Sequence, residues 1–368
     1  MIANESTAPS ALRSTRRARL EAAFRLERPD RPPILGGWLA APAHVQAITG
    51  CSSADFWQDP ARWARRAENV LGSDGAVDAF VPVQEGGYRC VDQHVMDARS
   101  AYTMEAVVRE IESQPGPEEV RASFDQESMY AQFAAALAAD QERFQDVVWC
   151  PADWDLNPIA LWYARFGYEN ALLLPALHPQ THLRLLRASA ERARQHAVLQ
   201  ARAIMDGIRP RGILFGEDLC GRNGPMISPE FLRREYYPLL EYAMEPLQAA
   251  GARLVWHCDG DVRPILDDLL ACGISGLQGF QRECGMELEW IVRRRTRAGD
   301  PLIIFGPLSV TETLPHGTAA EVRQAVHRAM EVCRSEASLV FFTSNTITPD
   351  VPLENVRAFW EEVSEVRW

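Results

Sequence analysis

Lysine is missing from this sequence of 368 residues, in which all 38 basic side chains are arginine. This absence excludes mechanisms that need a lysine amine, such as Schiff-base aldolases, pyridoxal enzymes and the phosphate-binding lysine of a P-loop. Arginine cannot replace lysine in these roles, because its guanidinium stays protonated at any working pH. Proton transfer must therefore run through His, Asp, Glu, Tyr, Cys or bound water.

Long apolar runs and closely paired cysteines are missing as well. No segment approaches the roughly 20 apolar residues that a membrane helix needs, and the polar segment 1–20 lacks the apolar centre of a secretory signal. The eight cysteines form no CxxC pair, so we expect free thiols in a reducing compartment. These features predict a cytoplasmic protein without a membrane partner.

An excess of positive charge is also absent, since the net charge is −12 and the sequence pI is about 5.3. This balance argues against a nucleic-acid partner, whose phosphates would have to be neutralised. Hydrophobic residues make up 47% and charged residues 24%, which is ordinary for a folded domain. The length suits one large barrel or two smaller domains.

From about residue 31 onward, short apolar runs alternate with longer amphipathic segments. The runs predict eight strands, at Pro33–Trp38, Val77–Val83, Asp146–Cys150, Gly212–Glu217, Arg253–His257, Gly276–Phe280, Leu302–Phe305 and Leu339–Thr343. Eight strands that alternate with helices favour an α/β chain folded as a single (β/α)₈ TIM barrel over residues 31–368. Residues 1–30 are expected to form an N-terminal helical extension. A doubly wound sheet is the alternative, and the lack of a GxGxxG after an early strand counts against it.

Three further segments carry local signals. Ser228 followed by Pro229 predicts an N-cap and a helix that runs to Gly251, and Thr318 with Glu321 fits a capping box. Residues 120–145 are rich in Ala and Gln and are expected to be helical. The turn-rich stretch 84–117, after the second strand, predicts an antiparallel excursion from the barrel.

Active sites of such barrels gather at the carboxyl ends of the strands, so the residues that follow each run are the candidates. Side chains alternate along a strand, which places His257 and Asp259 on one side and Cys258 on the other. This pair could act as a general acid or base with its orienting carboxylate, or could supply two metal ligands. A buried histidine capped by its neighbour is an equally simple interpretation of the same spacing.

Glu217 and Asp218 end another strand. Adjacent carboxylates repel each other, so one of them commonly acquires a raised pKa or binds a cation, although a solvated surface turn remains open. Further candidates for substrate binding follow or precede other strand ends. They are Trp38, Arg222, Asn223, Gln278, Ser344 and Asn345.

Four segments, in order and at sensible spacing, resemble the uroporphyrinogen decarboxylase superfamily. They are Gly216-Glu-Asp-Leu-Cys-Gly-Arg-Asn-Gly-Pro-Met-Ile-Ser-Pro-Glu230, Trp256-His-Cys-Asp-Gly-Asp-Val-Arg-Pro-Ile-Leu266, Leu314-Pro-His-Gly-Thr-Ala-Ala-Glu-Val-Arg323 and Ser344-Asn-Thr-Ile-Thr-Pro-Asp-Val-Pro-Leu-Glu-Asn-Val356. Leu26-Glu-Arg-Pro-Asp-Arg-Pro-Pro-Ile34 is similar to the family's opening segment. The resemblance implies a single (β/α)₈ barrel, and its members include porphyrinogen decarboxylases and corrinoid-linked methyltransferases.

Some methyltransferases of this superfamily hold zinc through His-x-Cys and a later Cys. Carried over to this sequence, the histidine falls on His257, the first cysteine on Asp259 and the later cysteine on Asn345. A thiolate-rich zinc site is therefore in doubt, whereas His257 and Asp259 could still hold a harder divalent metal. The arginine motif that clamps substrate carboxylates in the decarboxylases should fall near Gly36-Gly-Trp-Leu39, which contains no arginine.

The resemblance thus favours methyl or other one-carbon transfer from a small methylated donor to a corrinoid, bound as cobalamin or carried by a corrinoid protein. His257, Asp259, Glu217 and Asp218 are the expected catalytic residues. Decarboxylation of a carboxylated substrate, porphyrinogen-like or smaller, is the first alternative, and a ligand-binding barrel without catalysis is the second. A homo-oligomer is compatible with the sequence.

Overall fold

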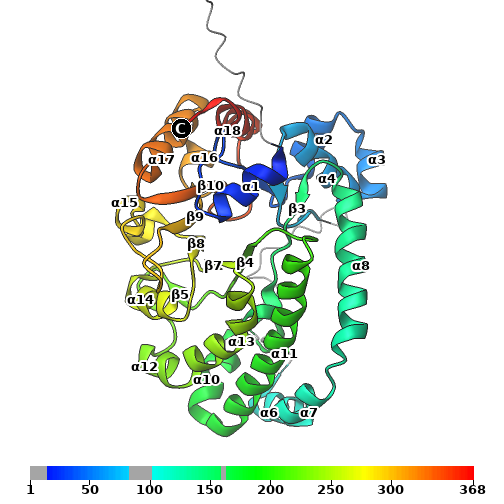
Figure 1. The fold of residues 1–368 in the computed structure, drawn as a ribbon, viewed down its shortest axis with the longest axis vertical. Helices are drawn as coiled ribbons and strands as arrows, with labels where there is room; N and C mark the ends of the chain where they lie inside the picture. Colours follow the sequence, from blue (N-terminus) through cyan, green and yellow to red (C-terminus); the bar gives the residue numbers. More distant parts are fainter. Residues whose placement is uncertain (1–14, 83–101, 159–162) are drawn as a thin grey trace, which may run out of the picture.

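The computed structural model describes residues 15–82, 102–158 and 163–368 (Figure 1). The first part begins with helix α1 and leads into three very short parallel strands separated by helices. Its elements are α1 (Arg16–Phe24), β1 (Leu35–Gly36), α2 (Pro42–Thr49), α3 (Ser53–Gln58), α4 (Pro60–Leu71), β2 (Gly75–Ala76), α6 (Met104–Ser113), α7 (Pro117–Ala122), α8 (Gln126–Phe144) and β3 (Val148–Trp149).

The middle of the chain contains the longest helix and a small hairpin. It comprises the 3₁₀ turn η1 (Trp154–Leu156), α9 (Tyr163–Phe166), α10 (Tyr168–Leu177), α11 (Pro179–Met205), β4 (Gly212–Gly216), the hairpin strands β5 (Cys220–Gly221) and β6 (Gly224–Pro225), α12 (Pro229–Phe231), the π turn η2 (Leu232–Tyr236) and α13 (Tyr237–Ala249). Ser228 caps α12 as expected, because its side chain accepts a hydrogen bond from the Phe231 amide.

The last third continues the alternation of strands and helices. Its elements are β7 (Arg253–His257), α14 (Arg263–Ala271), β8 (Gly276–Gln278), η3 (Arg282–Cys284), α15 (Leu288–Ile291), β9 (Leu302–Leu308), α16 (Thr313–His316), α17 (Ala319–Cys333), β10 (Ala337–Thr343) and α18 (Leu353–Glu365). The expected capping box opens α17, with Thr318 and Glu321 bonded reciprocally.

Two parallel sheets result, with strand orders β1-β2-β3 and β10-β9-β8-β7-β4. The sheets are linked by backbone contacts at both of their edges. The Phe341 amide of β10 donates to Pro33 O at 2.8 Å, just before β1, and the Asp153 amide after β3 donates to Leu214 O of β4 at 2.9 Å. An α/β fold with parallel strands and helical connections is therefore confirmed.

Two groups of apolar residues separate the inside of the strands from the outside. A small cluster contains residues of β1, β3, β4, β7, β9 and β10, including Leu35, Val148, Leu214, Val255 and Val340. The larger cluster packs the opposite faces of the strands against the helices. The alternation of side chains along each strand is the cause of this division.

The strands near the start of the chain depart from expectation. The second strand is Gly75–Ala76 rather than Val77–Val83, because the chain pairs with β1 immediately after the turn at Asp74, whose amide donates to Ile34 O. The helix expected at 120–145 is interrupted, since Asp125 caps a new helix by accepting from the Ser128 amide.

The expected antiparallel excursion at 84–117 lies largely outside the described residues, and its described end, from Met104, is helical. The described cysteines are free. Across the described ranges, no helix is both long and apolar enough to cross a membrane.

Candidate functional site

The carboxyl ends of four strands of the larger sheet, β4, β7, β8 and β10, bring the predicted polar residues together. His257 ends β7 and pairs in register with Gly216 of β4 on one side and with Gln278 of β8 on the other. Asp218 follows β4 by two residues, and Asn345 follows β10 in the same way. One ligand atom from each of Asp218, His257 and Asp259 lies within 4.8 Å of the others.

The imidazole of His257 is fixed by Gln278. The Gln278 side chain is buried, and its amide nitrogen donates to Thr343 O at 2.8 Å and to Ser344 O at 3.0 Å. Its amide oxygen must therefore face His257 Nδ1, with which it makes a short hydrogen bond. An oxygen acceptor requires Nδ1 to carry a proton, so in the neutral ring Nε2 holds the free lone pair.

The backbone of Gly279 packs closely against the imidazole beside Gln278. Gly279 has a φ of +85°, and a Cβ added there would lie 2.7 Å from His257 Nδ1. Glycine is needed at this position both for its backbone conformation and for this approach.

The free Nε2 of His257 faces acidic groups. It lies 3.7 Å from Asp218 Oδ1, and the His257 side chain is only 12% exposed. The same Asp218 oxygen accepts a hydrogen bond from the Asp259 amide at 2.9 Å, which ties the loop after β7 to the loop after β4.

Asp259 is the most perturbed of the acids in this group. Asn345 Nδ2 donates to its Oδ2 at 2.8 Å, whereas its Oδ1 is buried and has no hydrogen-bond partner among the described residues. Burial raises the pKa of Asp259 to about 6; the imidazole of His257 opposes the rise, and the nearby Asp218 charge adds to it. A carboxyl group with this pKa exchanges a proton near neutral pH, as an acid catalyst must.

Aromatic rings form one wall of the site. Trp38 and Trp154 stack with centroids 6.4 Å apart, and His257 meets both edge-on, at 5.8 Å and 5.6 Å. Trp38 also packs on Phe342 from β10. Trp38 is buried whereas Trp154 is 44% exposed, so Trp154 forms the solvent side of this wall.

The remaining predicted residues differ in how they are connected to this centre. Glu217 accepts a hydrogen bond from Asn157 Nδ2 at 3.3 Å, and its own amide donates to His257 O. Ser344 is buried and accepts from the Val310 amide. Arg222 and Asn223 are exposed at the turn of the β5–β6 hairpin, and within the described ranges no hydrogen bond or ion pair joins them to His257.

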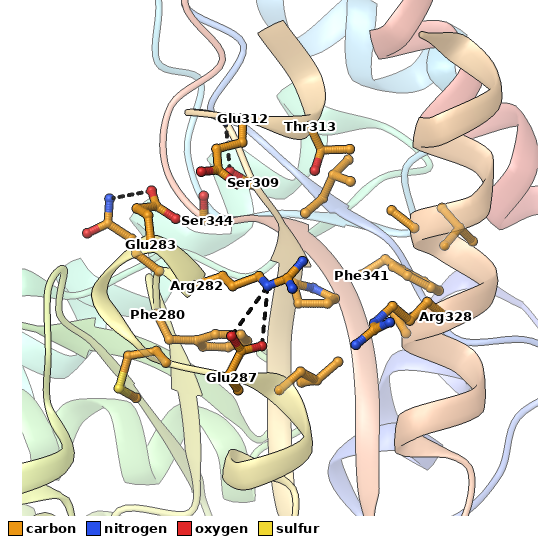
Figure 2. A pocket seen from close by; sticks show the side chains of 18 of the residues that line it. Phe280, Arg282, Glu283, Glu287, Ser309, Glu312, Thr313, Arg328, Phe341 and Ser344 are labelled. Carbon is orange, nitrogen blue, oxygen red and sulfur yellow. Dashed lines mark hydrogen bonds and ion pairs between the residues drawn. The ribbon is translucent and has the colours of Figure 1, made fainter. Parts of the chain in front are cut away.

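A cavity of about 130 Å³ lies beside the site, between the ends of β8 and β9 and helix α17 (Figure 2). Glu283, Ser309, Glu312 and Ser344 lie on one side of it, and Phe280 and Phe341 form an apolar floor. An ion pair between Arg282 and Glu287 lies across the cavity. The arginines of this cavity are thus engaged with carboxylates.

Sequence reasoning missed two features around the aromatic wall. Asn157 connects Glu217 to the buried Tyr236, whose hydroxyl donates to Asn157 Oδ1 at 2.8 Å. Asp153, at the start of η1, pairs with His196 from α11. The polar residues that follow β3 could have pointed to Asp153, but no signal marks a histidine in the middle of a long helix.

Comparisons with known proteins bear on the family and the fold of this chain. The uroporphyrinogen decarboxylase (URO-D) family model matches residues 167–366, more than half of the chain. The protein is therefore a member of the uroporphyrinogen decarboxylase superfamily, and the matched part contains His257, Asp259 and Asn345.

A solved structure is similar over nearly the whole chain. It is a methyltransferase from Methanosarcina mazei, with a TM-score of 0.57 and 16% sequence identity, and the match covers 95% of this chain and 98% of that one. At this identity the likeness establishes the fold. No curated protein sequence matches the chain.

Proposed function

We propose that this protein transfers a methyl group from a small methylated donor to a corrinoid, and that Asp259 protonates the atom the methyl group leaves. The observation that carries the proposal is the buried Oδ1 of Asp259, which has no hydrogen-bond partner among the described residues, in a carboxylate that lies close to His257 and Asp218. The proposal includes closure of the two parallel sheets into one (β/α)₈ barrel, which the backbone contacts at both sheet edges support. The site then lies at the barrel's carboxyl end, where barrel enzymes place their chemistry.

The surroundings of Asp259 and His257 differ, and they favour a different chemical role for each group. Asp259 is held partly protonated near pH 6 by burial and by the charge of Asp218, so it can donate a proton. His257, with its proton fixed on Nδ1, offers Nε2 as an acceptor that can orient a donor molecule. Acid and base assignments commonly follow from such paired groups with different environments.

A reduced corrinoid would supply the nucleophile that accepts the methyl group. The described rim suits a flat, partly apolar macrocycle, because exposed apolar side chains follow three adjacent strands. These are Phe80 after β2, Trp154 after β3 and Met226 in the hairpin after β4, with exposed fractions of 47%, 44% and 39%. We propose that a cobalamin, or the corrinoid of a partner protein, docks against this rim.

The residues present here do not fit the thiolate-type zinc site of the family. Asn345 stands at the later cysteine position, and its Oδ1 already accepts from the Thr346 amide at 2.7 Å. Its NH₂ group is therefore turned toward Asp259, where a metal ligand would need a lone pair. No step of the proposed reaction runs through a metal.

A divalent cation held by Asp218, His257 and Asp259 is the second candidate for this centre. The favouring observation is the same buried Asp259 Oδ1, whose charge a cation could neutralise as well as a proton. Nitrogen and oxygen ligands of this kind suit zinc or harder divalent ions. Titration of the purified protein with Co²⁺ separates the cases, because binding lost in His257→Ala would indicate the cation.

Decarboxylation of a porphyrinogen-like acid is less well supported. In the described part of the chain, no arginine hydrogen-bonds to Asp218, His257 or Asp259, while Asp218 and Asp259 lie together there. A substrate with several carboxylates would be repelled by these acids. Carbon dioxide release from smaller acids remains the outcome that would support a decarboxylase.

The test is a methyl-transfer assay with reduced cobalamin and candidate methoxy, methylamine and methylthio donors, with and without a corrinoid protein. We expect the methyl-cobalamin absorption band with at least one donor, and its loss in Asp259→Asn. Asp261→Asn is the matched control, because Asp261 lies two residues away and pairs with Arg263. If no donor is demethylated under either condition, the proposal is wrong.

A further inference from the structure

We infer that Asp153 and His196 are positioning residues, which hold Trp154 against His257 from behind the aromatic wall. The inference rests on the proposed function only in placing the reaction beside His257. Neither residue touches His257, and both act through the turn η1 that carries Trp154.

Burial holds the side chain of Trp154 only weakly. Its side chain is 44% exposed, whereas its stacking partner Trp38 is 8% exposed. A ring that is nearly half in water has few neighbours to fix its orientation. Its place 5.6 Å from His257 must therefore be set mainly by the backbone turn on which it stands.

Asp153 fixes that turn from the preceding position. Its Oδ1 accepts from the Asp155 amide at 3.1 Å, which caps η1, and its own amide donates to Leu214 O of β4 at 2.9 Å. Its backbone oxygen accepts from the Leu156 amide at 3.3 Å. One residue thus joins the start of the turn to the neighbouring strand.

Helix α11 holds the other carboxylate oxygen of Asp153. Gln200 Nε2 donates to Asp153 Oδ2 at 2.7 Å, and His196 Nδ1 lies 3.5 Å from the same oxygen. His196 and Gln200 are four residues apart and so share a face of the helix. The buried Arg209 in turn donates to Gln200 Oε1, which fixes the direction of the amide.

The surroundings of Asp153 and His196 favour the charged form of each side chain. The hydrogen bond to Asp153 raises the pKa of His196, and the Asp153 pKa is lowered although burial opposes this. Asp155 and Arg209 are the other charged groups that contribute at these two residues. His196 Nδ1 and Asp153 Oδ2 lie 3.5 Å apart as an ion pair, and their attraction adds to the hydrogen bond from Gln200 that holds the Asp153 carboxylate in place.

Asp153, Asp155 and His196 also have the spacing of a metal-ligand set. Both carboxylate oxygens of Asp153, however, already accept hydrogen bonds from protein donors. The group is therefore better described as a hydrogen-bonded support than as a cation site.

The structural test needs no substrate. The full chain is labelled with fluorotryptophan, and the Trp154 signal in the fluorine NMR spectrum is identified by its loss in Trp154→Phe. We expect His196→Leu to move this signal toward that of the free amino acid. His196→Asn should preserve the wild-type signal, because its amide nitrogen can replace Nδ1 as the donor.

Two further variants complete the structural test. His327→Leu is the matched control, since it removes an exposed histidine–glutamate pair between α17 and α18, and should leave the Trp154 signal unchanged. Should His196→Leu fail to fold, Asp153→Asn replaces it in the test. Asparagine keeps the shape of the Asp153 side chain, but it offers one acceptor oxygen where the carboxylate accepts hydrogen bonds through two. A Trp154 signal that stays in its wild-type position in the folded variant would overturn the inference.

A kinetic arm separates this inference from the proposed function. In the methyl-transfer assay, His196→Leu should lower kcat/KM by about tenfold through loss of orientation, and His196→Asn should restore it. The same change in a Trp154→Phe background should have little effect, because the ring it positions is gone. An equal loss in both backgrounds would contradict the inference, whereas failure of every donor would contradict only the proposed function.

Discussion

Asp259→Asn should make the folded protein more stable while it slows methyl transfer from donors with basic leaving groups. The substitution keeps the shape of the side chain and removes a charge that the folded state accommodates poorly. In the folded protein the pKa of this carboxyl is about 6, against 3.8 for the ordinary group. The folded state therefore binds the proton more readily than the unfolded chain does.

The sign of the pH dependence follows from that difference. Between about pH 4 and pH 6 the folded state carries the extra proton, so raising the pH through this window lowers the free energy of unfolding of the wild type. The full effect of such a pKa difference is about 3 kcal/mol. We expect Asp259→Asn to be more stable than the wild type at pH 5, and the difference to grow toward the full effect of about 3 kcal/mol by pH 8.

Urea denaturation of both proteins across this pH range measures the difference. Asp261→Asn serves as a control of opposite sign, because the hydrogen bond to Arg263 lowers the pKa of Asp261. This contribution to the free energy of unfolding is present above the pKa that Asp261 has in the unfolded chain, and it is lost as the pH falls. A stability gain of Asp259→Asn that fails to grow between pH 5 and pH 8, or a loss at pH 8, would refute the reasoning.

Three further changes probe the surroundings of His257. Gln278→Leu removes the acceptor that fixes the imidazole and should lower turnover by about 10-fold to 100-fold; Gln324→Leu, on the exposed face of α17, should not. Gly279→Ala should destabilise the fold by about 2 kcal/mol, measured by urea denaturation, because its φ is +85° and the new methyl group would meet His257 Nδ1. Trp38→Leu should cost about 3 kcal/mol in the same assay, since the indole is buried and packs on His257; a loss below 1 kcal/mol would show that these contacts matter little.

The later strands could be predicted from the sequence because their apolar runs are long and clearly bounded. Arg253–His257 is observed with the expected bounds, and alternation correctly placed His257 and Asp259 together. Cys258 is buried in the larger apolar cluster, which packs the strands against the helices, as the same alternation requires. The early strands are only two residues long, which is too short for any periodicity, so the apolar run at 77–83 misplaced the second one.

The sequence predicted many of the residues of the candidate site, but it did not predict the contacts between them. Gln278 was expected to bind substrate, whereas its contacts show that it orients His257. The role of Trp154 depends on Asp153 and on His196, which is 43 residues further along the chain. Such long-range pairs leave no local pattern, because they are created when helix α11 packs against the turn after β3.

The central claim is that Asp259 protonates the departing atom of a methylated donor. The most direct measurement compares the rate of cobalamin methylation by the wild type and by Asp259→Asn, using donors whose leaving groups differ in basicity. We predict that the wild-type rate falls as the pH rises through about 6, where the acid form is lost, and that Asp259→Asn is slow with basic leaving groups but recovers with activated ones. Equal rates for the two proteins with a basic leaving group, or the same loss with every donor, would contradict this role for Asp259.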